Sequence, residues 1–431
     1  MKKPFYGWVI VGVSFLIGVT EVGVFQNILS IFMKPMAQDF GWSRAAVTGA
    51  IAVGSICGGL VSPFVGPILD RYGPRLVAFL GIVFFSLGLF ALMFIRHLWQ
   101  LYLFFGMGRM IAYGVLGLVV TVSVSNWFVR RRGRALGITW IGERVGSALL
   151  PVMITFLILA YGWRMAWGVL GVVVFLMSGL PAVLFLRRRP EDMGLLPDGA
   201  VSIPDGKKPD GSLTTETRTE AAIVEDAEPA WTRPQATRTR AFWTLTLLTC
   251  LIPFLQGGIN FHIYPFLTDQ GISQKTAVLV ISTIAAFGAP GSVIWGMLAD
   301  RVRIQSLLAI NVFGSGLVFL LLYWTVGFEL TDGFRTGIVF VLAALNGMLH
   351  GGRNTLVSLI WPAFFGRIGL GSIYSFSIPF KSIANACGPF FAAICFDIFG
   401  SYALPFYLFA TTYIIVGVIS IRTQPPKMPG A

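Results

Sequence analysis

The stretch Gly66-Pro-Ile-Leu-Asp-Arg-Tyr-Gly-Pro-Arg75 is a compact charged turn between two long apolar segments. A second stretch, Gly296-Met-Leu-Ala-Asp-Arg-Val-Arg303, also follows one apolar segment and precedes another. The charged turn therefore recurs once, and residues 187–240, which lie between the two copies, form the only long polar part of the chain. These features predict two related halves of apolar helices joined by a polar loop.

The composition excludes a water-soluble protein. Of the 431 residues, 55% are hydrophobic and only 12% are charged, which leaves too little polar surface for water. The 50 glycines and 23 prolines would disrupt a soluble helical protein, whereas transmembrane helices tolerate both and pack through small residues. The chain is therefore expected to be a membrane protein that contacts the lipid bilayer.

The net charge of +13 does not indicate a nucleic-acid partner. Residues 187–240 carry nine basic and ten acidic side chains, so they are nearly neutral. The basic excess lies in short loops on the side that includes both termini and the 187–240 loop. The opposite side has only Lys34, Arg44, Arg96, Arg164, Lys275 and Arg335. By the positive-inside rule both termini are predicted to be cytoplasmic, in a multi-pass protein of the cell (inner) membrane.

A transmembrane helix needs about 20 apolar residues, and by this measure the chain contains twelve segments. They are expected near residues 7–33, 43–69, 75–96, 99–128, 134–160, 163–186, 241–268, 275–299, 305–328, 335–364, 368–396 and 401–421. The predicted fold is an all-α membrane protein with six-helix bundles at residues 1–186 and 241–431. The cytoplasmic linker between them, residues 187–240, lacks core-forming periodicity and is expected to be a mobile tether.

Three further stretches carry a family resemblance: Tyr6-Gly-Trp-Val9, Phe40-Gly-Trp-Ser-Arg44 and Trp127-Phe-Val-Arg-Arg-Arg-Gly-Arg-Ala-Leu-Gly137. Together with the two charged turns, they resemble the major facilitator superfamily of secondary transporters. Within it, these stretches look like signatures of the monocarboxylate porter branch, which includes the bacterial oxalate and formate exchangers. The resemblance implies twelve helices in two pseudo-symmetric halves, with one central site that opens to each side of the membrane in turn.

Six charged residues are predicted to lie inside the membrane: Glu21, Arg109, Glu143, Arg144, Arg353 and Lys381. Each such charge costs roughly 2.5 to 3.5 kcal/mol on insertion scales, so it is a functional hypothesis by default. Four cations against two carboxylates leave a positive surplus. A small anion is therefore the expected cargo.

Lys381 is expected near the middle of its helix. Tyr374, Ser377, Lys381 and Asn385 are spaced by three, four and four residues, which places them on one polar helix face. That face is expected to line the cavity. The resemblance to oxalate exchangers implies that Lys381 anchors the substrate, and the alternative is that it serves as a structural partner of Glu21.

Asn346, His350 and Arg353 are spaced by four and three residues and share a face of another helix. A guanidinium can bind a carboxylate through two parallel hydrogen bonds, so Arg353 is a second candidate contact. The alternative for Arg353 is a bond to helix-end carbonyls, and His350 is either a satisfied interior histidine or a proton site. Monocarboxylate porters usually carry their key arginine in helix eight, whereas residues 277–299 here contain no charge.

Glu143 and Arg144 are neighbours on one helix, so their side chains diverge and cannot face the same spot. Arg109 is a natural partner for Glu143, and the resemblance links an arginine of helix four to proton coupling. Glu21 then becomes the expected proton acceptor, because a buried carboxyl can exchange protons. Lys34 is expected either to attract the anion at the entrance or to anchor the helix at the membrane interface.

The charged turns are expected to act as gates between the halves. Asp70 and Asp300 can each cap a helix end and pair with an arginine across the two halves. Arg71, Arg75 and Arg301 belong to the same predicted gates. Their loss is expected to slow exchange between states without much change in the site.

No phosphate-binding GxxxxGK[ST], HExxH or GxSxG motif occurs, and the three histidines are scattered. No enzyme activity, cofactor or metal site is therefore expected. The sequence predicts a monomeric secondary transporter of a small carboxylate, a monocarboxylate such as lactate or pyruvate, together with a proton. The alternatives are an anion exchanger of the oxalate and formate type, a proton-driven exporter of drugs or amphiphiles, and a membrane solute sensor.

Overall fold

The computed structural model describes residues 5–199, 230–327, 332–399, 401 and 403–426. Within these ranges the chain is helical, and it contains no β-strand. The first group of helices is α1 (Gly7–Glu21), α2 (Gln26–Phe40), α3 (Arg44–Tyr72), α4 (Pro74–Ala91), α5 (Leu98–Ile111), α6 (Gly117–Trp127), α7 (Arg132–Val174) and α8 (Leu180–Phe185). The second group is α11 (Arg240–Asp269), α12 (Gln274–Ala299), α13 (Ile304–Gly327), α14 (Asp332–Phe365), α15 (Leu370–Ser375), α16 (Ile378–Phe399) and α17 (Ala403–Arg422). The predicted all-α fold is confirmed.

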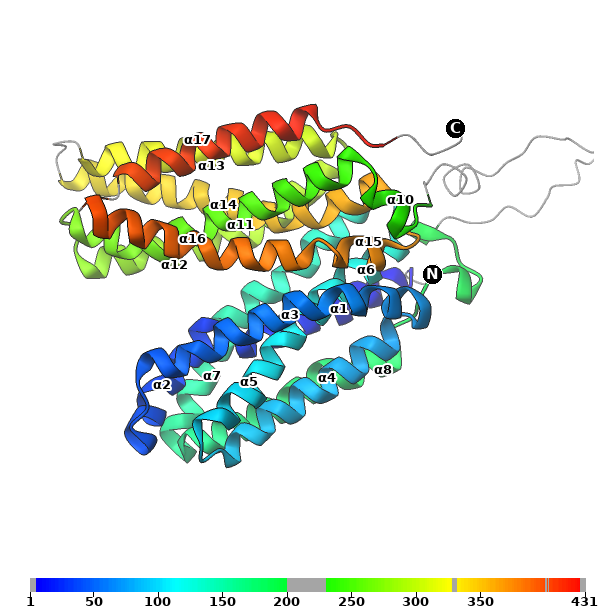
Figure 1. Ribbon diagram of the computed structural model, residues 1–431, viewed down its shortest axis with the longest axis horizontal. Helices are drawn as coiled ribbons and strands as arrows, with labels where there is room; N and C mark the ends of the chain where they lie inside the picture. Colours follow the sequence, from blue (N-terminus) through cyan, green and yellow to red (C-terminus); the bar gives the residue numbers. More distant parts are fainter. Residues whose placement is uncertain (1–4, 200–229, 328–331, 400, 402, 427–431) are drawn as a thin grey trace, which may run out of the picture.

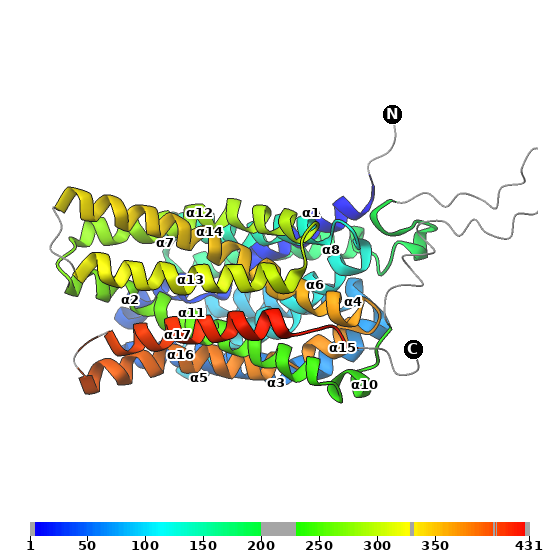
Figure 2. The same ribbon diagram turned by 90° about the horizontal axis from the view of Figure 1, so that it is seen from above.

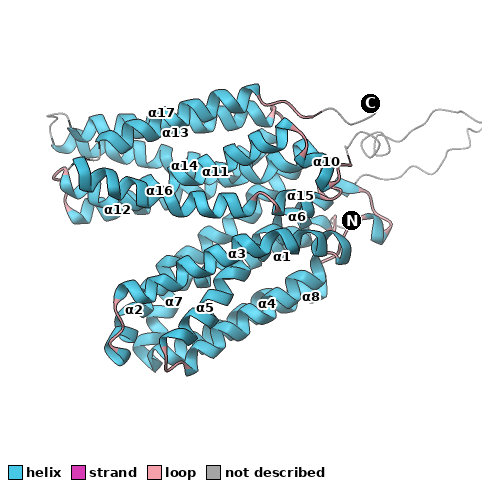
Figure 3. Cartoon of the chain, viewed as in Figure 1, coloured by secondary structure: helices cyan, strands magenta, loops and turns pink. Residues whose placement is uncertain are grey.

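The two groups form two helix bundles that lie side by side (Figure 1). The long helices run along one common axis, as the view turned by 90° shows (Figure 2), and short loops connect them (Figure 3). The bundles converge toward the end where α1 begins and α17 ends, which we call the termini end. They diverge toward the opposite end, which carries the turn between α2 and α3 and which we call the far end (Figure 1).

Eleven helical stretches of the described residues are long and apolar enough to cross a membrane. One of them, Arg132–Phe185, is 54 residues long. It breaks at Gly162, whose φ of 82° is easily reached only by a residue without a Cβ atom. The break divides this stretch into two crossings, so the prediction of twelve spans, with a boundary between residues 160 and 163, is confirmed.

The first predicted span, residues 7–33, is not one continuous helix. α1 gives way to a 3₁₀ turn at Val22–Val24, and Phe25 is extended, with ψ of 162°, before α2 begins. The freed carbonyl of Val24 accepts a hydrogen bond of 3.2 Å from Arg109 of α5. The apolar pattern does not reveal this break, because the side chain that stabilises it comes from a different helix.

At the termini end the bundles touch through backbone. α7 crosses α12 at Gly133 and Gly296, and a Cβ atom on either glycine would overlap the carbonyl of the other. Small residues let the two helices approach more closely than larger side chains would allow. This crossing holds the bundles together at the termini end.

The linker prediction needs correction at both described ends, while its residues 200–229 lie outside the described residues. Asp198 accepts hydrogen bonds from the backbone of Val129, Arg130 and Arg131 at 2.8–3.1 Å. At the other end Trp231 is 3% exposed and packs edge-on against Phe365, next to the short helix α10 (Arg233–Thr237). Both ends therefore pack on the bundles, although neither has a periodic apolar face. The hydrogen bonds of Asp198 and the buried ring of Trp231 hold them there.

Candidate functional site

A cavity of about 480 Å³ lies between the two bundles. The first bundle contributes residues of α1, α5, α6 and α7 and the turns next to them, and the second contributes residues of α11, α14, α15 and α16. Seven predicted site residues line it: Glu21, Arg109, Glu143, His350, Tyr374, Lys381 and Asn385. The structure therefore brings together residues that are up to 364 positions apart in the sequence, from Glu21 to Asn385.

The charges of the cavity are divided between the bundles. Glu21, Glu143 and Arg109 come from the first bundle, and Lys381 comes from the second. Glu21 interacts electrostatically with the three other charges. Within the part of the chain that the structure describes, however, no two of these four residues form a contact ion pair. The four charged side chains therefore interact across the cavity through electrostatics and not through direct ion pairs.

Arg109 holds the break in the first span. Its Nε donates to the Ser55 hydroxyl at 3.0 Å and its Nη1 donates to the Val24 carbonyl at 3.2 Å. The guanidinium also lies over the ring of Tyr113, 4.7 Å from the centroid. The predicted contact pair between Arg109 and Glu143 is not formed, because Nε and Nη1 of Arg109 are directed to Ser55 and to the broken helix.

The predicted polar face around Lys381 is only partly correct. Tyr374, Lys381 and Asn385 line the cavity, and Asn385 Nδ2 donates to the Tyr113 hydroxyl of the other bundle at 3.2 Å. Ser377 is fully buried instead, and its hydroxyl donates to the Tyr374 carbonyl at 2.8 Å. The reason is that Ser377 lies between α15 and α16, where the helix is interrupted and the spacing rule for one continuous face no longer applies.

Arg353 does not reach the cavity. It is 1% exposed, and it donates to the Tyr413 hydroxyl at 2.8 Å, to Asn311 Oδ1 at 3.3 Å and to the Ser315 hydroxyl. These partners lie on α13 and α17, inside the second bundle. These partners are side chains and not the helix-end carbonyls expected as the alternative. The donors that a carboxylate would need are directed into the second bundle, away from the cavity lining.

Two other predicted contacts also lie outside the cavity lining. Arg144 packs its guanidinium against Gly288 of α12, where no side chain keeps it away. Asn346 is 3% exposed and does not line the cavity. Counted over the lining residues alone, the charges balance, since these residues include two cations, Arg109 and Lys381, and two carboxylates. Arg144 and Arg353 lie behind the lining and interact electrostatically with His350.

Neutral polar side chains complete the wall of the second bundle. The Gln256 amide nitrogen lies 2.8 Å from His350 Nδ1, and Asn354 and Ser358 line the cavity beside them. The sequence analysis missed Gln256 and Asn354. The available signal was an amide side chain within a long apolar segment, where a polar group needs a partner or a ligand.

Two carboxylates connect the bundles at the termini end. Asp70 accepts from the backbone of Gly371 at 3.0 Å and of Ser372 at 2.7 Å, at the start of α15. Asp300 accepts from the backbone of Gly133 at 2.7 Å and of Arg134 at 3.2 Å, at the start of α7. Each carboxylate therefore caps a helix of the opposite bundle.

Backbone N–H groups take the place of the predicted contact ion pairs, because each carboxylate lies at a helix start whose N–H groups are unpaired. Asp300 nevertheless interacts electrostatically with Arg134 of the other bundle. Partial burial raises the pKa of the Asp300 carboxyl above its ordinary value, against the opposing effect of these N–H groups. Arg71, Arg75 and Arg301 are exposed. Arg75 donates to the Val183 carbonyl within its own bundle at 2.7 Å. Lys34 is exposed on α2 and does not line the cavity.

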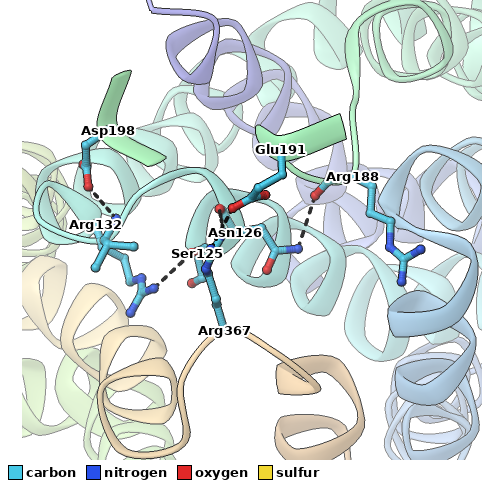
Figure 4. Close-up of polar contacts among 8 residues, drawn as sticks. Ser125, Asn126, Arg132, Arg188, Glu191, Asp198 and Arg367 are labelled. Atoms are coloured by element: carbon cyan, nitrogen blue, oxygen red, sulfur yellow. Dashed lines mark hydrogen bonds and ion pairs between the residues drawn. The ribbon is translucent and has the colours of Figure 1, made fainter. Parts of the chain in front are cut away.

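A third connection at the termini end involves the start of the linker (Figure 4). Arg367, in the turn between α14 and α15, forms an ion pair of 2.7 Å with Glu191. The same guanidinium donates to the Asn126 carbonyl at the end of α6 at 3.1 Å. Arg367 is 7% exposed. This cluster therefore joins the second bundle both to the first bundle and to the linker.

Comparison with known proteins gives consistent matches. A sequence profile of the Major Facilitator Superfamily matches residues 15–377. Monocarboxylate transporter 11 of Mus musculus is 26% identical over 432 residues, covering 98% of this chain and 88% of that protein. The uncharacterized MFS-type transporter YcxA of Bacillus subtilis (strain 168) is 23% identical, covering 97% of this chain and 95% of YcxA. The fucose:proton symporter FucP of E. coli has the same fold, with a TM-score of 0.69 at 14% identity, covering 98% of this chain and 100% of FucP.

Proposed function

Because the chain belongs to the Major Facilitator Superfamily, we propose that it is a secondary transporter that carries one organic monocarboxylate together with one proton. The observation that carries the proposal is the balanced charge of the cavity. Two carboxylates and two cations line it, and the lysine lies on the opposite bundle from both carboxylates. The similarity to a protein named monocarboxylate transporter supports the same substrate class.

The charge balance favours coupled transport. The formal charges of the residues that line the empty cavity sum to zero, since Glu21 and Glu143 offset Arg109 and Lys381. The charges of one monoanion and one proton also sum to zero. An anion alone would leave one net charge in the closed cavity, at a cost of roughly 2.5 to 3.5 kcal/mol on insertion scales. The bundles therefore close most easily when both the proton and the anion are bound, or neither is.

Lys381 is the proposed anion anchor. Its side chain has no hydrogen-bond or ion-pair partner among the described residues, although it lines the cavity. Arg109 is the other cation there, and its Nε and Nη1 already donate to protein groups. A substrate carboxylate beside Lys381 would supply the counter-charge that the structure leaves open.

Glu21 and Glu143 are the proposed proton sites. They interact with each other electrostatically, and two neighbouring carboxylates favour binding of one proton between them. Both carboxylates already interact electrostatically with Lys381 across the cavity, so they can supply its counter-charge when the empty carrier closes. An empty carrier that can return makes symport more favourable than obligatory exchange.

The sidedness of the proposed cycle follows from the positive-inside rule, which places the termini end in the cytoplasm. The Asp70 and Asp300 caps join the bundles at that end, while the bundles diverge at the far end (Figure 1). We assign this arrangement to the outward-facing state of an alternating-access cycle. In the inward-facing state both caps are released.

The test is uptake of labelled L-lactate, pyruvate, formate and oxalate into proteoliposomes, with and without an inward proton gradient. Symport predicts that the gradient stimulates uptake of a monocarboxylate into empty vesicles. Uptake only into vesicles preloaded with anion would identify an exchanger and would remove the proton role of Glu21. Absence of flux for a broad panel of carboxylates would refute the proposal.

A further inference from the structure

The cavity is large compared with the smallest carboxylates. Its volume is about 480 Å³. It falls within the range of ~300–1,000 Å³ that encloses drug-sized ligands. Formate or lactate would leave most of this space to water.

The lining beyond the charges is aromatic and aliphatic. Phe25, Tyr113, Trp140 and Tyr374 line the cavity with rings drawn from both bundles. The aliphatic side chains Leu118, Ile252, Val357 and Ile378 also line it. An apolar group of the substrate that covers these surfaces would gain free energy from their removal from water, and an aromatic group would add ring contacts.

The unpaired side chain of Lys381 indicates how many negative charges the ligand carries. Among the described lining residues, Lys381 is the one permanent cation whose side chain makes no hydrogen bond or ion pair. A dianion such as oxalate would bring a second negative charge close to Glu21 and Glu143. A monoanion is therefore the better match.

We infer that the substrate is a monocarboxylate with a bulky apolar group, aromatic or branched, whose carboxylate binds Lys381 and whose apolar group fills the remaining cavity. This inference rests on the proposed function and narrows its substrate class. It also distinguishes the cavity from a general amphiphile site, because a neutral molecule with the same apolar group cannot form an ion pair with Lys381.

The test uses a matched pair of acids, L-lactate and L-3-phenyllactate, which differ by one phenyl ring. Uptake of both is measured in proteoliposomes under an inward proton gradient, and the neutral amide of 3-phenyllactate is added as a competitor. The inference predicts a KM for phenyllactate about tenfold or more below that for lactate, the range expected for burial of an added apolar group. The amide is expected not to compete.

A variant tests whether the cavity causes this preference. Val357→Phe adds volume at a lining position of α14, and Val341→Phe makes the same change on the same helix at a position that is 61% exposed. The first variant is expected to reduce the preference for phenyllactate to about one, and the second to leave it unchanged. Size-exclusion chromatography confirms that both variants are folded.

The outcomes separate the inference from the proposed function. Gradient-stimulated uptake of lactate with an equal or higher KM for phenyllactate in the unmodified protein overturns the inference and leaves the proposed function standing. A preference that survives in Val357→Phe also overturns it. If neither acid is transported and neither competes with other carboxylates, both ideas are refuted. Competition by the amide as strong as by the acid would indicate an amphiphile site instead.

Discussion

The buried cations in and around the cavity differ in whether their donors already have protein partners. Arg109 and Arg353 both hold their guanidinium groups with neutral protein acceptors, whereas Lys381 lines the same region with its side chain unpaired in the described structure. A cation whose donors are used stabilises the fold, and a cation whose donors are open can bind a ligand. On this difference rests our proposal that the two arginines are structural and that the lysine binds the substrate.

Replacing Lys381 by methionine removes the charge and keeps most of the side-chain length. The KM for the substrate is expected to rise about 10- to 100-fold, because a hydrogen bond to a charged group contributes about 1.5–3 kcal/mol. Lys381→Arg is expected to restore part of the affinity. The control is Lys275→Met, an exposed position. An unchanged KM in Lys381→Met proteoliposomes would contradict the anchor role.

The two carboxylates can be separated by comparing net uptake with counterflow. Glu21→Gln is expected to abolish stimulation by a proton gradient and to retain exchange of labelled for unlabelled substrate, since exchange needs no net proton movement. Glu143→Gln tests the second site in the same assay. Full stimulation by the gradient in both variants would show that neither carboxylate carries the proton.

Arg353 is expected to affect stability more than transport kinetics. Arg353→Met leaves Asn311, Ser315 and Tyr413 without their donor, and each buried unsatisfied group costs about 1–3 kcal/mol. The melting temperature in detergent, followed by fluorescence-detected size exclusion, should therefore fall. Arg301→Met, at an exposed arginine, is the control. A normal melting temperature combined with a large rise in KM would return Arg353 to the substrate site.

Helix ends, more than helix faces, define the conformation of this protein. The starts of α7 and α15 are each capped by a carboxylate of the opposite bundle, and the first span is interrupted beside the cavity. A helix start carries unpaired N–H groups and a partial positive charge, so a carboxylate there is stabilising. The contacts between bundles can form and break without loss of any helix.

Asp70→Asn and Asp300→Asn are expected to shift the protein toward the state that is closed at the far end. The neutral amide retains the shape of the cap but interacts more weakly with the helix start. Distances between spin labels at Arg96 and Lys275, measured by double electron–electron resonance in a background without the native cysteines, should shorten. Asp192→Asn, in the exposed part of the linker, should leave the distances unchanged. Unchanged distances in both cap variants would contradict the gate.

The sequence predicted the elements well, because long apolar segments separated by charged turns are sufficient to locate membrane spans. It predicted Lys381 and Glu21 in the site, because an isolated charge in an apolar segment is a strong signal. It failed for Arg353, since helical spacing places a residue on a face but does not say which neighbour that face meets. It failed for Ser377 because the interruption between α15 and α16 changes the face.

At the scale of the whole molecule, the net charge carried in each step decides whether the transport rate depends on the membrane potential. With a balanced cavity, neither the empty nor the fully loaded carrier moves net charge through the membrane. Uptake under a fixed proton gradient is therefore expected to be independent of a potassium diffusion potential of about 100 mV, which would otherwise contribute about 2.3 kcal/mol per charge. Acceleration by an inside-positive potential would show that anions move with fewer protons than proposed.

The division of the chain into residues 1–186, 187–240 and 241–431 stays a prediction. The caps of Asp70 and Asp300 nevertheless show that the two bundles depend on each other. Each bundle supplies the acid for one cap and the helix start for the other. If the chain were divided in the linker, each fragment would carry the acid of one cap and the helix start of the other. A substitution in either copy of the charged turn therefore alters a contact of both halves.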